Sequence, residues 1–177
     1  MSVVAETLRQ LEQELGVSLN HISIIFSVQG LRPWELACCW VEQPEKPVIQ
    51  LRPQLERGSY FGYTLREVIR HEVVHALRAH LPYSQFEELL ACHVAMAQPV
   101  SFFGRLRRNL SALFFRSWEP IVFLGLSLLP PLFDYSSFAF LPLITAIIFL
   151  GVRLWFEWVK FNQLLKRGSI SRILFFV

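Results

Sequence analysis

The chain has 177 residues, of which 53% are hydrophobic, and a formal net charge of +3. This length allows one modest domain with an appendage and excludes two ordinary globular domains. Basic residues beyond position 100 flank apolar runs and do not interleave with aromatic side chains as in a nucleic-acid groove, so no nucleic-acid partner is expected. Only three cysteines and no basic, apolar leader at the start favour a reducing, cytoplasmic setting for the first half.

The first fifty residues predict a helix followed by a small sheet. Apolar residues recur at helical spacing from Val3 to Leu15, and Gly16 follows as a C-cap. Three β-rich runs come next, separated by turn residues: 21–28, 34–42 and 48–51. We therefore expect an α+β domain over residues 1–99 with a small, mostly antiparallel, three-stranded sheet.

Two capping boxes predict two further helices. Thr64-Leu65-Arg66-Glu67 is the first, and its outer side chains satisfy each other's exposed amides. A helix is expected from about residue 65 to 81, because Pro82 ends it. Ser84-Gln85-Phe86-Glu87 is the second box, in which the glutamate is expected to turn back to the serine amide. It opens a helix that reaches residue 96 or 97.

The second half of the chain is predicted to lie at and in a membrane. Arginines alternate with leucine and phenylalanine over residues 100–117, which suits a helix in the membrane interface or, alternatively, a soluble linker helix. Two apolar runs, 120–133 and 138–152, predict a transmembrane helical hairpin over residues 118–158. A basic apolar tail follows over 159–177. The alternative for the hairpin is burial in a soluble oligomer.

Basic residues predict the orientation of this hairpin. Arginines precede it, arginines and lysines follow it, and the connecting turn, residues 134–137, contains neither. By the positive-inside rule, both termini and the first domain face the cytoplasm, at an inner or plasma membrane. The hairpin also offers a surface for forming a homo-oligomer.

A metal-binding pattern lies in the first of the two capped helices. Arg70-His71-Glu72-Val73-Val74-His75 contains H-E-x-x-H, which places two imidazoles one turn apart on one face, able to hold one zinc ion. Glu72 lies beside them as a general base for water whose pKa zinc has lowered. The alternative is a solvated surface helix, which the apolar neighbours Val73 and Val74 disfavour.

A catalytic zinc site needs a third protein ligand and one open position. The candidates are His80, Glu87, Glu88, Cys92 and His93. His80 projects away from the other two imidazoles, and Glu87 is expected in its capping box. Glu88 is the predicted ligand, because it shares a face with alanines that let two helices pack closely. Cys92, as a thiolate, ranks second and His93 third, and a solvated Glu88 is the alternative.

At these residues the chain resembles the gluzincin metallopeptidases, especially the minigluzincins and the membrane peptidases related to the CAAX prenyl proteases. Residues 71–80 are similar to their H-E-x-x-H-x-x-x-x-H helix, and residues 88–95 to their E-x-x-A-D-x-x-A helix. The order of elements over residues 1–98 is also similar. The resemblance implies a zinc peptidase in which His71, His75 and Glu88 bind the metal and Glu72 is the general base.

One position departs from the family pattern. Where the family has an aspartate that supports a zinc ligand, this chain has Cys92. Asp134, in the turn of the predicted hairpin, is the only aspartate in the chain, so no other aspartate can take this role. Loss of such support weakens metal affinity or activity.

The sequence therefore predicts a membrane-anchored zinc endopeptidase that cuts membrane-proximal or unfolded peptides at the cytoplasmic face. Strand 48–51 resembles the edge strand along which a peptide substrate pairs, and His93 and Tyr83 are candidates for the oxyanion stabiliser. The alternative is a proteolytically inactive membrane metalloprotein that acts as a partner-binding or oligomerising scaffold. Cys92 favours that alternative and Glu72 argues against it. A third hypothesis gives the function to the hairpin, as in membrane remodelling.

Overall fold

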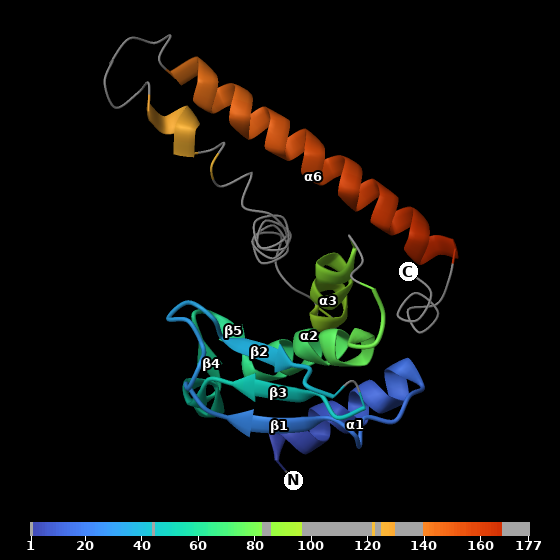
Figure 1. Cartoon of the computed structure of the whole chain (residues 1–177). Helices are drawn as coiled ribbons and strands as arrows, with labels where there is room; N and C mark the ends of the chain where they lie inside the picture. The colour runs from blue at the N-terminus through green and yellow to red at the C-terminus, as the bar shows by residue number, and fades with distance from the viewer. Residues whose placement is uncertain are drawn as a thin grey trace. The chain divides into compact units, whose positions relative to one another are not determined.

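The computed structural model describes residues 2–43, 45–82, 86–96, 122, 125–129 and 140–167. The described residues fall into two compact units, one within residues 1–99 and the other within residues 100–167, which are described separately. The first unit is α+β, as predicted. It contains an N-terminal helix, a three-stranded sheet, a short hairpin and two further helices (Figure 1).

Helix α1 (Val3–Leu15) begins and ends where the sequence predicts. Ser2 caps its N-terminus by accepting a hydrogen bond from the Ala5 amide at 3.3 Å. Gly16 ends the helix with φ at 68°, a left-handed conformation that glycine adopts without steric cost. Leu11 and Leu15 are buried on one face, so packing as well as capping holds α1 in place.

The three-stranded sheet is mixed, which corrects the expectation of a mostly antiparallel one. Its strands β1 (Ser23–Phe26), β2 (Ala37–Trp40) and β3 (Val48–Leu51) lie in the order β1-β3-β2. β1 runs parallel to β3 and β2 runs antiparallel to it. The expectation that strand 48–51 lies at an edge was wrong. β3 is central, with Ile49 and Leu51 fully buried, because the chain between β1 and β2 is long enough to leave room for β3 between them.

Two buried polar side chains at β3 hold the loop between β1 and β2. Gln50 donates two hydrogen bonds to this loop and accepts a third from Trp40 Nε1 at 2.6 Å. Arg52, just after β3, donates two more through its guanidinium. The acceptors in the loop are the backbone oxygens of Ser27, Gln29, Arg32 and Glu35. Since buried polar groups need partners, these bonds fix the loop beside the start of β2.

A 3-10 helix, η1 (Pro53–Arg57), and a two-stranded hairpin, β4 (Ser59–Tyr60) with β5 (Tyr63–Thr64), lead into α2 (Leu65–Arg78). The predicted capping box is present: Thr64 Oγ1 accepts from the Glu67 amide and Glu67 accepts from the Thr64 amide. α2 ends three residues earlier than predicted, because its last turn tightens into bonds such as the one from the Leu81 amide to the Arg78 carbonyl.

Helix α3 (Glu87–Ala95) packs against α2. Ala91 is fully buried and Ala95 nearly so, as the prediction of close helix packing requires. The predicted cap at Ser84 lies outside the described residues. In the structure, α3 begins after Phe86, whose side chain makes no capping hydrogen bond.

The second unit contains one long apolar helix, α6 (Leu141–Arg167). By length and composition, residues Leu141–Lys166 are able to cross a membrane, with a mean hydropathy of 1.6 in their most apolar stretch. α6 continues past residue 158 into the segment predicted as a tail. Most of the predicted first arm of the hairpin, its turn and the interfacial segment 100–117 lie outside the described residues, so the hairpin stays a prediction.

Candidate metal centre

The H-E-x-x-H residues lie in the middle of α2, where burial of the apolar face fixes the helix against its neighbours. Val73 and Val74 are fully buried within the motif. The spacing of four residues brings the His71 and His75 rings to 5.0 Å between centroids. Their Nε2 atoms lie 3.2 Å apart. Both imidazoles therefore direct the same ring nitrogen toward one point.

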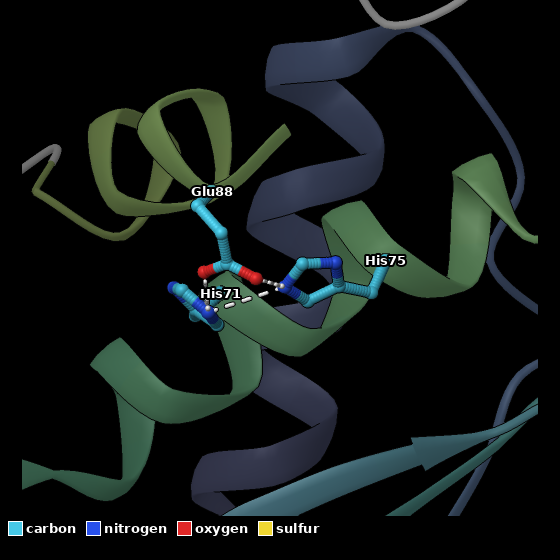
Figure 2. A group of neighbouring side chains, drawn as sticks. All are labelled: His71, His75 and Glu88. Atoms are coloured by element: carbon cyan, nitrogen blue, oxygen red, sulfur yellow. Dashed lines mark hydrogen bonds and ion pairs between the residues drawn. The ribbon is translucent and has the colours of Figure 1, made fainter. Parts of the chain in front are cut away.

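Glu88 reaches this point from α3, as predicted. Its Oε2 lies 3.5 Å from His71 Nε2, and its Oε1 lies 3.4 Å from His75 Nε2. Figure 2 shows the three side chains turned toward one another across the two helices. One ligand atom from each residue lies within 4.8 Å of the others, a grouping that is able to hold a metal ion.

Cys92 lies behind His71 and outside this group. Its Sγ is 3.9 Å from His71 Nδ1, on the side of the ring that faces away from Glu88. Cys92 follows Glu88 by one helical turn, so α3 presents both to the same imidazole. The thiol thus contacts the outer nitrogen of His71, and the structure does not bring it to the point shared by the three predicted ligands.

Glu87 lies behind His75, and Ser84, its expected partner in the capping box, lies outside the described residues. Glu87 Oε1 is 2.7 Å from His75 Nδ1, and Glu87 Oε2 accepts a hydrogen bond from Arg78 Nε at 3.2 Å. Charge-assisted bonds of this kind are about twice as strong as hydrogen bonds between neutral groups. Sequence reasoning missed this contact because α2 and α3 come together only in the tertiary structure.

The other predicted candidates do not join the group. His80 is exposed and lies beyond the end of α2. His93 lies on α3 five residues after Glu88, which places it about 140° around the helix from Glu88. Tyr83 lies outside the described residues. The oxyanion stabiliser therefore stays a prediction.

The pKa of Glu72 is raised above its ordinary value, chiefly because the carboxyl is buried. The nearby His71 and His75 oppose this increase, whereas the charges of Glu88 and Glu35 add to it. Glu72 also acts on Cys38 and Cys39 of β2, whose thiol pKa values burial and the Glu72 charge both raise. The charge of the base candidate therefore acts on the edge strand β2 as well as on the imidazoles.

The imidazoles and carboxylates of the centre shift one another's protonation. Burial alone would lower the pKa of His71, but contacts with Cys92 and Glu88 hold it well above its usual value. The pKa of His75 is also raised, by Glu87 and other carboxylates against the effect of burial. For Glu87 and Glu88, burial alone would raise the pKa, yet the facing histidines hold both values below normal. Without a metal ion, the cluster therefore retains protons on its imidazoles.

Arg70, immediately before the motif, joins three helices and was also missed by sequence reasoning. Its Nε donates to the Val94 carbonyl of α3 at 2.8 Å. Its two terminal nitrogens bind the Glu14 carboxylate of α1 at 3.1 and 2.5 Å. The helical spacing of residues in the sequence indicates that Arg70 is buried, because it shares the apolar face of α2 with Val73, Val74 and other buried residues. A charged residue on such a face predicts a buried partner.

No family model, no curated protein and no solved structure matches this chain. The chemistry of the centre is therefore argued from its own geometry.

Proposed function

We propose that the centre binds one zinc ion through His71, His75 and Glu88. The observation that carries this proposal is the spacing of the ligand atoms: the two imidazole Nε2 atoms lie 3.2 Å apart, and those of His75 and His71 lie 3.4 and 3.5 Å from different oxygens of Glu88. In a tetrahedral zinc site with bonds of about 2.0–2.1 Å, neighbouring ligand atoms lie about 3.3–3.4 Å apart. One face of an octahedron with the same bonds has shorter edges, about 2.9 Å. Two imidazoles also disfavour magnesium and calcium, which prefer oxygen ligands.

We further propose that the protein is a membrane-anchored zinc endopeptidase. Bound zinc would polarise the peptide carbonyl and lower the pKa of a water in the open fourth position. Glu72 takes a proton from the attacking water as the water oxygen bonds to the carbonyl carbon. The same carboxyl then gives this proton to the amine nitrogen as the C–N bond breaks. The raised pKa of Glu72 suits both steps, since it brings the group nearer to neutral pH.

Strand β2 is the proposed site of peptide pairing, in place of β3. Within the described residues, β2 pairs only with β3, so its other edge is open to a further strand. The Arg52 amide donates to the Leu36 carbonyl, so these two residues form a hydrogen-bonded pair. Along β2, residues that bond to β3 therefore alternate with residues that do not. Ala37 and Cys39 therefore direct their backbone groups away from β3, toward the open edge. An extended peptide added there would pair with the strand whose thiols the Glu72 charge affects.

The proposed base is tested with Glu72→Gln in the full-length, detergent-purified chain. Glutamine keeps the shape of the side chain but accepts no proton, so turnover of a quenched-fluorescent peptide library should fall by at least about 100-fold. Zinc content, measured by atomic absorption, should stay at the wild-type value. Glu56→Gln, which changes an exposed carboxylate in η1, is the matched control.

Metal content tests the ligand set separately. Wild-type protein should hold one zinc per chain, and both His75→Ala and Glu88→Ala should reduce that content. Wild-type protein that holds no zinc even when supplied with it would overturn the proposal. Undiminished turnover by Glu72→Gln would overturn only the role of Glu72.

The contact between Cys92 and His71 favours a second candidate function, an inactive metalloprotein scaffold. A thiol at 3.9 Å supports His71 Nδ1 less strongly than the family's aspartate would. If this weakness limits the centre, Cys92→Asp should increase zinc affinity, by up to about 10- to 100-fold, and should increase or create turnover. A competition titration with a chromophoric chelator measures the first effect. Wild-type turnover that equals that of Cys92→Asp would remove the argument for the scaffold.

A further inference from the structure

We propose that Glu87, held by Arg78, is the positioning residue that sets the tautomer and orientation of His75 for metal binding. This inference rests on the proposed zinc site and concerns the tautomer and orientation of its second imidazole, His75. It gives Glu87 a role that differs from that of its neighbour Glu88, although both residues lie on the first turn of α3.

The geometry of His75 divides its two ring nitrogens between two carboxylates. Nδ1 lies 2.7 Å from Glu87 Oε1, whereas Nε2 lies 3.4 Å from Glu88 Oε1 and 3.2 Å from His71 Nε2. A carboxylate only accepts hydrogen bonds, so the short contact requires a proton on Nδ1. In the neutral ring, Nε2 then keeps its lone pair, directed at the point where the three ligand atoms meet.

Arg78 keeps Glu87 in place. The side chains of Arg78 and Glu87 are 2% and 11% exposed, and the guanidinium Nε lies 3.2 Å from Glu87 Oε2. Arg78 also donates toward the Pro82 carbonyl at 3.5 Å, just after α2. One carboxylate oxygen is thereby bound to Arg78 and the other is left for His75. A side chain held at both oxygens has little freedom to turn toward Glu88 or toward solvent.

The two imidazoles are consequently supported in different ways. His71 Nδ1 meets the thiol of Cys92 at 3.9 Å, and His75 Nδ1 meets an ionic carboxylate at 2.7 Å. Hydrogen bonds from a metal-binding histidine to a carboxylate fix the ring and increase its basicity. The strong carboxylate support in this centre is thus on the second histidine of the motif, which offsets part of what Cys92 lacks at the first.

The first test measures the tautomer without any metal. Full-length, ¹⁵N-histidine-labelled protein is treated with chelator, and two-bond ¹⁵N–¹H correlation spectra are recorded at a pH where His75 is neutral. Wild-type His75 should carry its proton on Nδ1, and Glu87→Ala should move a substantial share of that proton to Nε2. Glu87→Gln should retain the wild-type tautomer, because the amide oxygen still accepts from Nδ1. A wild-type ring protonated on Nε2 would overturn the inference, whatever the protein does with zinc.

The second test measures zinc affinity by competition with a chromophoric chelator. Glu87→Ala should weaken binding by about 10- to 100-fold, Glu87→Gln should recover part of this loss, and Arg78→Met should weaken binding less than Glu87→Ala. Thermal unfolding of the metal-free variants identifies any that fail to fold, and Glu87→Gln is the variant least able to disturb the fold. Equal zinc affinity in wild type and Glu87→Ala contradicts the positioning role. Absence of zinc binding in wild type contradicts the proposed function instead.

Discussion

At the scale of single residues, the neighbourhood of Glu72 is arranged to keep nearby thiols neutral. Burial and the charge of Glu72 raise the pKa of Cys39 on β2 to about 12. Metal ligation and nucleophilic attack both require the thiolate. Cys39 therefore stays protonated, and it would not compete with the imidazoles and Glu88 for a metal ion at the proposed centre.

The raised pKa values of His71 and His75 predict how zinc stabilises the fold at different pH. Zinc binds neutral imidazoles, so protons compete with it, and the increase in Tm caused by zinc should grow as pH rises from about 6 to about 8. The stability of the metal-free protein should instead decrease as pH rises over this range. Its histidines contribute stability that is complete below their unfolded pKa of about 6.5 and is lost as pH rises through the higher folded values.

Thermal unfolding with zinc and with chelator across this range checks both trends. In the metal-free protein, the lowered pKa values of Glu87 and Glu88 should add a loss of stability on the acid side, as pH falls from about 4.3 through the folded values. A zinc-induced increase in Tm that is constant with pH, or larger in acid, would contradict the assignment of His71 and His75 as ligands.

At the scale of secondary-structure elements, two arginines on α2 bind carboxylates of α1 in different environments. Arg66 binds Glu6 at 3.2 Å, with the two side chains 32% and 37% exposed. Arg70 binds Glu14 one turn later, with its own side chain only 5% exposed, and also donates to Val94. The first pair is solvated, so salt and water reduce its value. The second positions α3, and with it Glu88.

We therefore expect Arg70→Met to destabilise the protein by about 3 kcal/mol, since it leaves the buried Val94 carbonyl without its donor and removes the link to Glu14. Arg66→Met is the matched control and should cost less than about 1 kcal/mol. Thermal unfolding of the full-length chain, followed by circular dichroism, compares the two. Similar losses of stability in both variants would show that the contact of Arg70 with three helices adds no stability beyond that of the Arg66 pair.

How far the sequence predicts these elements depends on how local each interaction is. The ends of α1 and the start of α2 follow from caps within three or four residues, so they were predicted closely. The central position of β3 depends on pairing with segments about 10 and 25 residues away, which composition does not specify. The approach of Glu88 to the two imidazoles was predicted from helical spacing and small neighbours. The contact of Glu87 with His75 was not, because a local cap explained the same residue equally well.

At the scale of the whole molecule, α6 exposes a largely apolar surface. Exposed apolar side chains recur along its length, and the most exposed among them are Leu141, Ile148, Trp155 and Phe156. Residues 141–152 contain no charge, whereas Lys160 and Lys166 lie in the last two turns. Such a helix is stable in water only when its surface is covered, and lipid is the cover we propose.

If α6 crosses a bilayer, Ile148→Arg should weaken insertion by about 2.5–3.5 kcal/mol, the cost of an arginine near the centre of a span. The fraction of the chain that resists extraction by alkaline carbonate should fall accordingly. Gln163→Arg, in the basic final part of the same helix, should leave that fraction unchanged. Full carbonate resistance of Ile148→Arg would argue against α6 as a membrane span.

The contacts of Arg70 also set an order of events during synthesis. Glu14 precedes Arg70 by 56 residues and Val94 follows it by 24, so the centre cannot close until residue 94 has left the ribosome. The strongly apolar part of the chain is made only after that point. A domain generally folds as a unit once it has emerged, N-terminal domains first. The nascent chain can thus complete the domain that holds the candidate metal centre before α6 has been translated, and the two halves then need not fold in competition with each other.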